Sequence, residues 1–325
     1  MSKKHMVAAI NQTLDNEMKK DDAIVLLGED VGVDGGVFRV TDGLIDKYGE
    51  NRVIDTPLAE AGIVGAAIGM AINGLKPVPE IQFSGFMYQA FHHIKQHMAR
   101  FRQRTEGTLD LQMVLRAPST GGIRALEHHS ESPENFYVHS QGLKVVVPSG
   151  PYDAKGLLLT SLRCKDPVIF LEPKKLYRSF KEDVPDEEYT IQFGKANIRR
   201  EGKDVTVVTW GSTVHVVEEA AKTLEKKGVS IEVIDIRTLN PLDIDTIVES
   251  VKKTNRVVVA HESPGNGGFG AEIVSRIQEN AIYHLEAPIR RATSFDIPYP
   301  QFAHENNYLV NPDRVMYEVL KTLEN

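Results

Sequence analysis

The chain has 325 residues and a mass of 36.2 kDa, more than one hydrophobic core usually serves, so two domains are expected. Its 38 basic and 45 acidic residues give a net charge of −7 and an isoelectric point near 5.9, which argues against a nucleic-acid partner. One cysteine, Cys164, rules out an intrachain disulfide and a cysteine cage for a metal, and it favours a cytoplasmic location.

The first residues of the chain form no apolar signal segment, because Asn11 and Asp15 interrupt them early. The longest uncharged apolar stretch, residues 63–72, has 10 residues, whereas a membrane-spanning helix needs about 20. We therefore expect neither a secretory signal nor a membrane span.

Strand-like and helix-like segments alternate along the first part of the chain. Apolar runs predict buried strands at residues 23–27, 76–83, 109–115, 144–148 and 167–171. Helical patterns lie between them at residues 60–72, 87–104 and 152–162. This order favours an α/β fold with parallel strands and crossover helices.

An acidic segment at residues 181–189, which contains Pro185, lacks apolar periodicity and predicts a linker. We therefore expect one domain at residues 1–185 and a second at residues 186–325. The α/β pattern restarts in the second domain, with strands at 204–209, 230–235 and 256–261 and helices at 213–227, 242–252 and 270–280.

Glu60 is the first candidate for chemistry. Thr56 and Pro57 are typical of a helix N-cap and first helical position, which places Glu60 in the first turns. Residues 61–71 are all small or apolar, so we expect this helix to be buried all round and to sit at a subunit or cofactor contact. A desolvated carboxyl group suits proton exchange. The alternative is a capping or packing role.

His128 and His129 form the second candidate, in a glycine-led loop that follows the strand predicted at residues 109–115. Catalytic residues of parallel α/β proteins lie on loops at the carboxyl ends of strands, and histidine exchanges protons near neutral pH. Adjacent histidines chelate one metal poorly, which disfavours zinc. An exposed loop histidine without function is the alternative.

Two further patterns are weak. His93 and His97 lie four residues apart on a basic helix, but no HExxH motif and no third ligand accompany them, so a solvated or partner-binding cationic face is the preferred interpretation. Residues 265–270 match G-x-G-x-x-G between a strand and a helix, which fits either a dinucleotide site or a plain turn. A phosphate-binding G-x-x-x-x-G-K-[ST] motif is absent from the sequence.

A set of motifs is spread along nearly the whole chain: Gly28-Glu-Asp-Val-Gly, Asp55-Thr-Pro-Leu-Ala-Glu60, Pro79-Glu-Ile-Gln-Phe, His129-Ser-Glu-Ser-Pro-Glu, Gly142-Leu-Lys-Val-Val, Tyr152-Asp-Ala-Lys-Gly and Phe170-Leu-Glu-Pro-Lys. Together these motifs resemble one family, the beta subunits of the decarboxylating first component of 2-oxo acid dehydrogenase complexes. The second domain is similar to the transketolase C-terminal domain.

The resemblance implies a thiamine diphosphate enzyme in which this chain supplies the pyrimidine side of the cofactor pocket. Glu60 matches the glutamate that bonds the aminopyrimidine ring, and Phe86 matches the aromatic residue that packs against it, with Gln89 nearby. His129, rather than His128, matches the histidine that faces the lipoyl group.

The resemblance also implies partners. A Gly-Asp-Gly motif followed by Asn-Asn, which holds diphosphate and Mg²⁺ in such enzymes, is missing here, so an alpha subunit is expected to supply it in an α2β2 assembly. A lipoyl-bearing dihydrolipoamide acyltransferase is the further partner, and a K⁺ ion is expected near Leu162, Cys164 and Asp166. The motifs beginning at His129 and Glu172 favour branched-chain 2-oxo acids, with pyruvate or acetoin as alternatives.

Two other classes of function compete with this interpretation. A dinucleotide oxidoreductase would use residues 265–270 to bind NAD or FAD. A non-catalytic scaffold would keep the fold but would not depend on Glu60 or His129.

Overall fold

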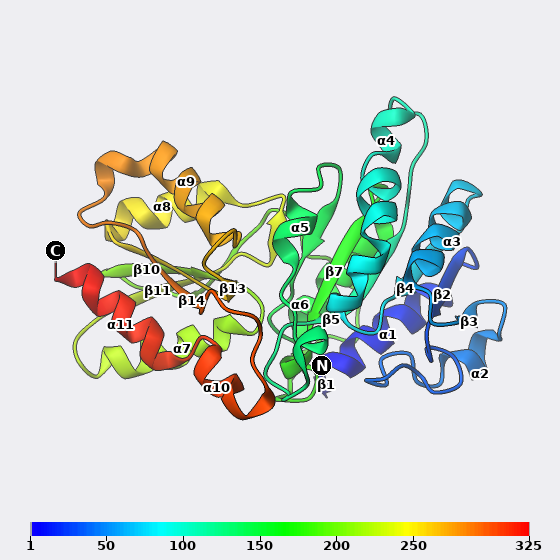
Figure 1. Ribbon diagram of the computed structural model, residues 1–325, viewed down its shortest axis with the longest axis horizontal. Helices are drawn as coiled ribbons and strands as arrows, with labels where there is room; N and C mark the ends of the chain where they lie inside the picture. The colour runs from blue at the N-terminus through cyan, green and yellow to red at the C-terminus, as the bar shows by residue number, and fades with distance from the viewer. Residues whose placement is uncertain (1, 325) are drawn as a thin grey trace.

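The computed structural model describes residues 2–324 and contains two α/β halves that lie side by side (Figure 1). The N-terminal half is built on a seven-stranded sheet of order β12-β6-β7-β5-β4-β2-β3, and the C-terminal half on a five-stranded sheet of order β14-β13-β10-β11-β9. A third sheet joins β1 and β8. The predicted α/β class is confirmed.

Six strands of the large sheet are parallel, so their carboxyl ends meet at one edge. They are β2 (Ile24–Gly28), β3 (Val53–Asp55), β4 (Lys76–Glu80), β5 (Val114–Ser119), β6 (Lys144–Val146) and β7 (Val168–Pro173). The seventh, β12 (Thr238–Asn240), comes from the C-terminal part of the chain and pairs antiparallel with β6. The two halves therefore share this sheet.

The helices of the N-terminal half flank this sheet. They are α1 (Met6–Met18), α2 (Leu44–Tyr48), α3 (Glu60–Ile72), α5 (Glu134–Val138) and α6 (Pro151–Arg163). α1 packs against α6. The strands predicted in this half are present, but residues 109–113 precede β5, because only residues 114–119 pair with β7.

A single helix at residues 87–104 is a wrong prediction. The segment forms a 3-10 helix η1 (Ser84–Ala90), a π-helix η2 (His93–Met98) and the short α4 (Phe101–Arg104). The reason lies in the spacing of its buried residues. Ser84, Met87 and Ala90 recur every three residues, as a 3-10 helix requires, and Ile94 and Met98 then follow at intervals of four.

The N-cap and the burial of α3 differ from the prediction, although the helix spans the predicted residues. The helix begins at Glu60 after Ala59, whereas the N–H of Thr56 donates to the carbonyl of Gly28 at 2.9 Å. The helix is not buried all round, because Gly62 and Ala66 are exposed in this chain. One face of α3 is therefore uncovered in this chain.

The acidic segment predicted as a linker contains a strand. Within it, β8 (Glu182–Val184) pairs antiparallel with β1 (Ser2–Lys4), which ties the segment to the start of the chain. The position of the domain boundary at residue 185 stays a prediction.

The C-terminal half contains each element predicted there, shifted by at most a few residues. Its strands are β9 (Asn197–Arg200), β10 (Val205–Thr209), β11 (Ile231–Asp235), β13 (Val257–Pro264) and β14 (Arg290–Ser294). Its helices are α7 (Thr213–Glu225), α8 (Ile244–Thr254), α9 (Gly270–Ala281), α10 (Glu305–Tyr308) and α11 (Pro312–Leu323). α7 and α11 pack together on one face, and α8 and α9 on the other (Figure 1).

The apolar faces of these elements form the cores of both halves. Among residues 2–324, no helix is both long enough and apolar enough to span a membrane.

Candidate active site

The site predicted from the sequence lies where four neighbouring parallel strands end. The order β5-β4-β2-β3 brings together the segments that follow them: Glu29 after β2, α3 after β3, η1 after β4, and residues 120–133 after β5. We call residues 120–133 the histidine loop. α3 and the 3-10 turn η3 (Glu127–His129) both pack against η1. This edge is where parallel α/β proteins place their active sites.

Glu60 is a buried carboxyl group with a free acceptor. It is 3% exposed, and its Oε2 atom is buried without a hydrogen-bond partner. Glu29 lies close to it: burial raises the pKa of Glu29, and the charges of Glu60 and Asp30 raise it further. An unpartnered buried carboxyl oxygen is costly unless a ligand satisfies it, so the site fits a ligand that offers this oxygen a hydrogen bond.

His129 sits among aromatic side chains. Its ring makes edge contacts with Phe83 and Phe86, with centroids 4.4 Å and 5.3 Å away. Its Nδ1 atom is buried without a hydrogen-bond partner. Burial lowers the pKa of His129, and the charges of His128 and Lys174 lower it further. The imidazole is therefore neutral near pH 7 and able to accept a proton.

The other predicted site residues lie differently. Phe86 is half-buried on η1, beside Phe83 and His129. Gln89 and His128 are exposed. The structure thus brings Phe86 and His129 into contact. In residues 2–324, no hydrogen bond joins the side chain of Gln89 to either of them.

Sequence reasoning missed three neighbours of this site. Phe83 packs on His129, and Glu29 lies close enough to Glu60 for the charge of Glu60 to raise its pKa. The third neighbour is Lys174, whose charge lowers the pKa of His129. The ammonium nitrogen of Lys174 lies 6.0 Å from the ring centroid of Phe83. Each of these three residues lies in one of the motifs that carry the family resemblance. Those motifs were the only sequence signal that could have identified them.

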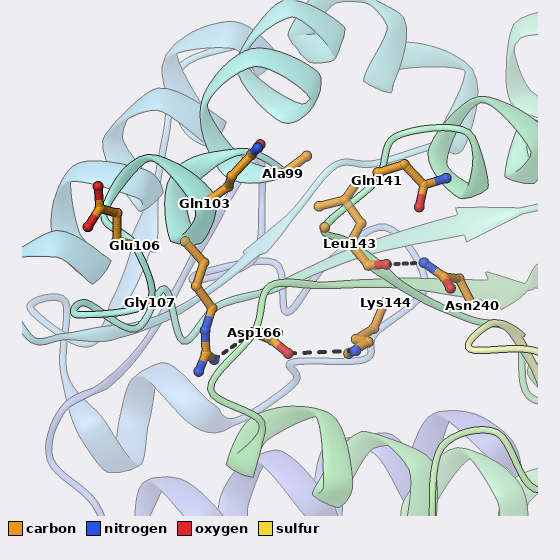
Figure 2. A pocket seen from close by; sticks show the side chains of 11 residues that line it. Ala99, Gln103, Glu106, Gly107, Gln141, Leu143, Lys144, Asp166 and Asn240 are labelled. Atoms are coloured by element: carbon orange, nitrogen blue, oxygen red, sulfur yellow. Dashed lines mark hydrogen bonds and ion pairs between the residues drawn. The ribbon is translucent and has the colours of Figure 1, made fainter.

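The predicted potassium site lies at the opposite edge of the sheet, near the amino ends of β6 and β7, beside a pocket of about 680 Å³ (Figure 2). The carboxylate of Asp166 pairs with Arg102 at 2.7 Å and with Lys144 at 3.6 Å. The carbonyl of Leu162 accepts a hydrogen bond from Gln112 at 2.6 Å. Two cations already neutralise Asp166, so this carboxylate fits an added cation poorly, and potassium stays a prediction.

The histidines of the basic helix lie close together. The ring centroids of His92, His93 and His97 are 5.4 to 5.6 Å apart. Among residues 2–324, no group of three or more His, Cys, Asp or Glu side chains is arranged to hold a metal ion.

The glycine-rich turn at residues 265–270 connects β13 to α9, as predicted. A Cβ atom on Gly268 would collide with the carbonyl oxygen of Pro264 and lie 2.7 Å from Cε1 of His261, and one on Gly270 would collide with the His261 ring. His261 is fully buried and stacks on Trp210 with centroids 5.0 Å apart. Close packing on this imidazole and on the Pro264 carbonyl explains both glycines, which supports the plain-turn interpretation over a dinucleotide site.

Comparison with known proteins agrees with this geometry. The family profile described as "Transketolase, pyrimidine binding domain" matches residues 2–179, and "Transketolase, C-terminal domain" matches residues 194–315. The chain is 50% identical over 324 residues to the pyruvate dehydrogenase E1 component subunit beta of Staphylococcus aureus (strain Mu50 / ATCC 700699), covering 100% of both. The chain belongs to the family of E1 beta subunits.

A second relative in this family, from Acholeplasma laidlawii, carries the same name and is 51% identical over 316 residues, 97% of each chain. A solved split-gene transketolase, described as an inactive beta4 tetramer, has a TM-score of 0.81 and 23% identity and covers 98% of each chain, which supports the fold. The predicted family is confirmed. The preference for branched-chain substrates finds no support among these relatives, whereas the pyruvate alternative does.

Proposed function

We propose that this chain is the beta subunit of a pyruvate dehydrogenase E1 component, active with thiamine diphosphate and an alpha subunit. The observation that carries the proposal is the unpartnered buried Oε2 of Glu60 at the edge where four parallel strands end. The 50% identity to a pyruvate dehydrogenase beta subunit along the entire chain supports it.

Thiamine diphosphate, when bound, supplies the carbon nucleophile and accepts the electrons released when the 2-oxo acid loses CO2. Glu60 would hold a proton between its Oε2 atom and a ring nitrogen of the pyrimidine, in a place that excludes water. Phe86 would flank the ring. Lacking the Gly-Asp-Gly and Asn-Asn motif, the chain would leave the diphosphate and Mg²⁺ to the alpha subunit.

His129 would act later in the reaction, when the acyl group passes to the lipoyl group of an acyltransferase. A neutral imidazole can accept or donate a proton there, and its unpartnered Nδ1 leaves one ring nitrogen available. Contacts with Phe83 and Phe86 would fix the orientation of the ring.

Reconstitution with an alpha subunit tests this proposal. The chain alone should bind thiamine diphosphate weakly and should not decarboxylate 2-oxo acids, whereas the assembled enzyme should be active. We expect kcat/KM for pyruvate to exceed that for 3-methyl-2-oxobutanoate by about tenfold or more, since each of the two extra methyl groups costs about 1–3 kcal/mol in a pocket that fits pyruvate. Decarboxylation by the isolated chain would contradict the shared site, and the reverse preference would restore the branched-chain assignment.

A further inference from the structure

The histidine loop begins with two backbone amides that are bound by the other half of the molecule. The N–H of Gly121 donates to Oε1 of Glu262, and the N–H of Gly122 donates to Oε1 of Glu305. Glu262 lies in β13 and Glu305 begins α10, so both acceptors belong to the C-terminal half. In Figure 1 the chain between β14 and α10 runs along the boundary between the halves.

Each of these carboxylates is held by its own half. The hydroxyl of Ser212 donates to Oε2 of Glu262 at 2.9 Å, and the hydroxyl of Tyr299 donates to Oε1 of Glu305 at 2.9 Å. Glu305 is 1% exposed. Glu262 is partly buried. Hydrogen bonds from backbone amides to carboxylates are among the stronger ones in proteins, so both loop amides are firmly fixed.

A buried lysine fixes the residue before them. The ammonium group of Lys174 donates to the carbonyl oxygen of Thr120. Burial lowers the pKa of Lys174 to about 7, while the charges of Glu262 and Glu305 oppose this shift. The lysine thus joins the cluster formed by the two carboxylates.

The backbone at this attachment depends on glycine. A Cβ atom on Gly121 would collide with the hydroxyl of Tyr299. Gly122 has φ of +90°, and a Cβ there would lie 2.7 Å from Cδ of Lys175. Gly121 therefore admits the close approach of Tyr299 from the C-terminal half, and Gly122 admits that of Lys175 from the N-terminal half.

The C-terminal end of the histidine loop is attached at the same point as its start, near Glu262. The N–H of Thr120 donates to the carbonyl of Glu131 at 2.9 Å, and the hydroxyl of Ser132 donates to Glu262 at 3.4 Å. The loop is thus closed at its base, and His129 lies between the two attached ends. A shift of the base would move the imidazole relative to Phe83 and Phe86.

We propose that Glu262 and Glu305 are positioning residues, which hold the histidine loop in the conformation that places the His129 ring against Phe83 and Phe86. The C-terminal half would then set the geometry of a side chain that belongs to the N-terminal half. The consequence for acyl transfer rests on the function proposed above for His129.

Hydrogen–deuterium exchange on the full chain tests the positioning itself. In Glu305→Ala and in Glu262→Ala, amides of residues 123–130 should exchange about 10- to 100-fold faster than in the wild type, and trypsin should cleave faster after the exposed Arg124. Glu305→Gln keeps an acceptor for Gly122 and Tyr299, so it should stay within about threefold of the wild type. If one alanine variant fails to fold, the other gives the answer.

Glu232→Ala is the matched control, because Glu232 is a buried carboxylate of the C-terminal half that bonds Ser250 and Lys253 and does not touch the loop. It should leave exchange in residues 123–130 unchanged. Wild-type exchange there in both alanine variants, or faster exchange only at residues 121 and 122, would overturn the proposal.

Two half-reactions of the enzyme assembled with an alpha subunit separate this inference from the proposed function. Glu305→Ala should reduce acylation of a lipoyl domain about tenfold more than decarboxylation with an artificial electron acceptor. Suppose that His129→Ala abolishes acylation. If Glu305→Ala then speeds exchange in the loop but leaves acylation normal, the positioning role is overturned. Full activity of His129→Ala would instead overturn the function proposed for the histidine, while the exchange experiment would still decide the positioning.

Discussion

Arg116 binds the carboxylate of Glu172 through two hydrogen bonds, from Nε to Oε1 at 2.7 Å and from Nη2 to Oε2 at 3.0 Å. Its Nη1 donates to Glu80 at 2.7 Å, and the hydroxyl of Tyr177 donates to Glu172 at 2.6 Å. Glu80, Arg116 and Glu172 come from the adjacent strands β4, β5 and β7, and all are at most 4% exposed. Burial raises the pKa of Glu80, an effect that Arg116 opposes. One buried cation thus joins three strands of the sheet that carries the site.

Arg116→Met should therefore destabilise the fold strongly. The variant leaves two buried carboxylates without their cation, and breaking a buried pair in this way costs about 3–5 kcal/mol of the free energy of unfolding. Urea unfolding followed by the fluorescence of Trp210, the one tryptophan of the sequence, measures the effect.

Arg102→Met is the control for this substitution. Arg102 pairs with Asp166, and both side chains are partly exposed, so the loss should stay below about 1 kcal/mol. Equal effects of the two variants would show that the buried position of Arg116 has no special importance.

Periodicity located most elements because burial follows the geometry of regular strands and α-helices. α3 and β6 begin at the predicted residues, since their apolar patterns fit one period. The single helix predicted at residues 87–104 failed because the backbone changes from a 3-10 to a π-helical period within this segment.

The site was only partly predictable for a different reason. Glu60 and His129 stand in recognisable local motifs, but the groups that fix the histidine loop do not. Glu262 lies 141 residues from Gly121, and Glu305 lies 183 residues from Gly122. Such partners are set by the packing of two halves, which the period of a single sequence does not encode.

The pH dependence of stability should include a contribution from Glu134. Burial raises the pKa of Glu134 from its ordinary value of 4.5 to about 7. Between these values the folded chain keeps a proton that the unfolded chain loses. The contribution of Glu134 to the free energy of unfolding is therefore complete below about pH 4.5. It falls by up to ~3 kcal/mol as the pH rises toward 7.

Glu134→Gln should remove this slope. From pH 4.5 to 7 the free energy of unfolding of the wild type should fall relative to that of the variant by up to ~3 kcal/mol, as measured by urea unfolding at several pH values. Glu279→Gln, on an exposed position of α9, should leave the wild-type curve unchanged. An unchanged slope in Glu134→Gln would contradict the assignment.

Glu60→Gln tests the proton that we assign to the cofactor site. The amide keeps the size and polarity of the side chain but has no exchangeable carboxyl proton. Exchange of the C2 hydrogen of thiamine diphosphate in the assembled enzyme should slow by about 100-fold or more, as measured by NMR after acid quench. Cofactor affinity should change much less. Wild-type exchange with normal affinity would rule out the role.

His129→Ala should separate the two halves of the reaction, because the imidazole is assigned to the step that follows decarboxylation. Turnover of 2-oxo acid with an artificial electron acceptor should persist, while acylation of a lipoyl domain should fall by about 100- to 10,000-fold. His128→Ala is the adjacent control: this side chain is exposed and lies outside the aromatic contacts of His129, so both reactions should stay within a few fold of the wild type. A larger loss in His128→Ala would mean that the assignment within the histidine pair is off by one residue. No loss in either variant would mean that the loop histidines are structural.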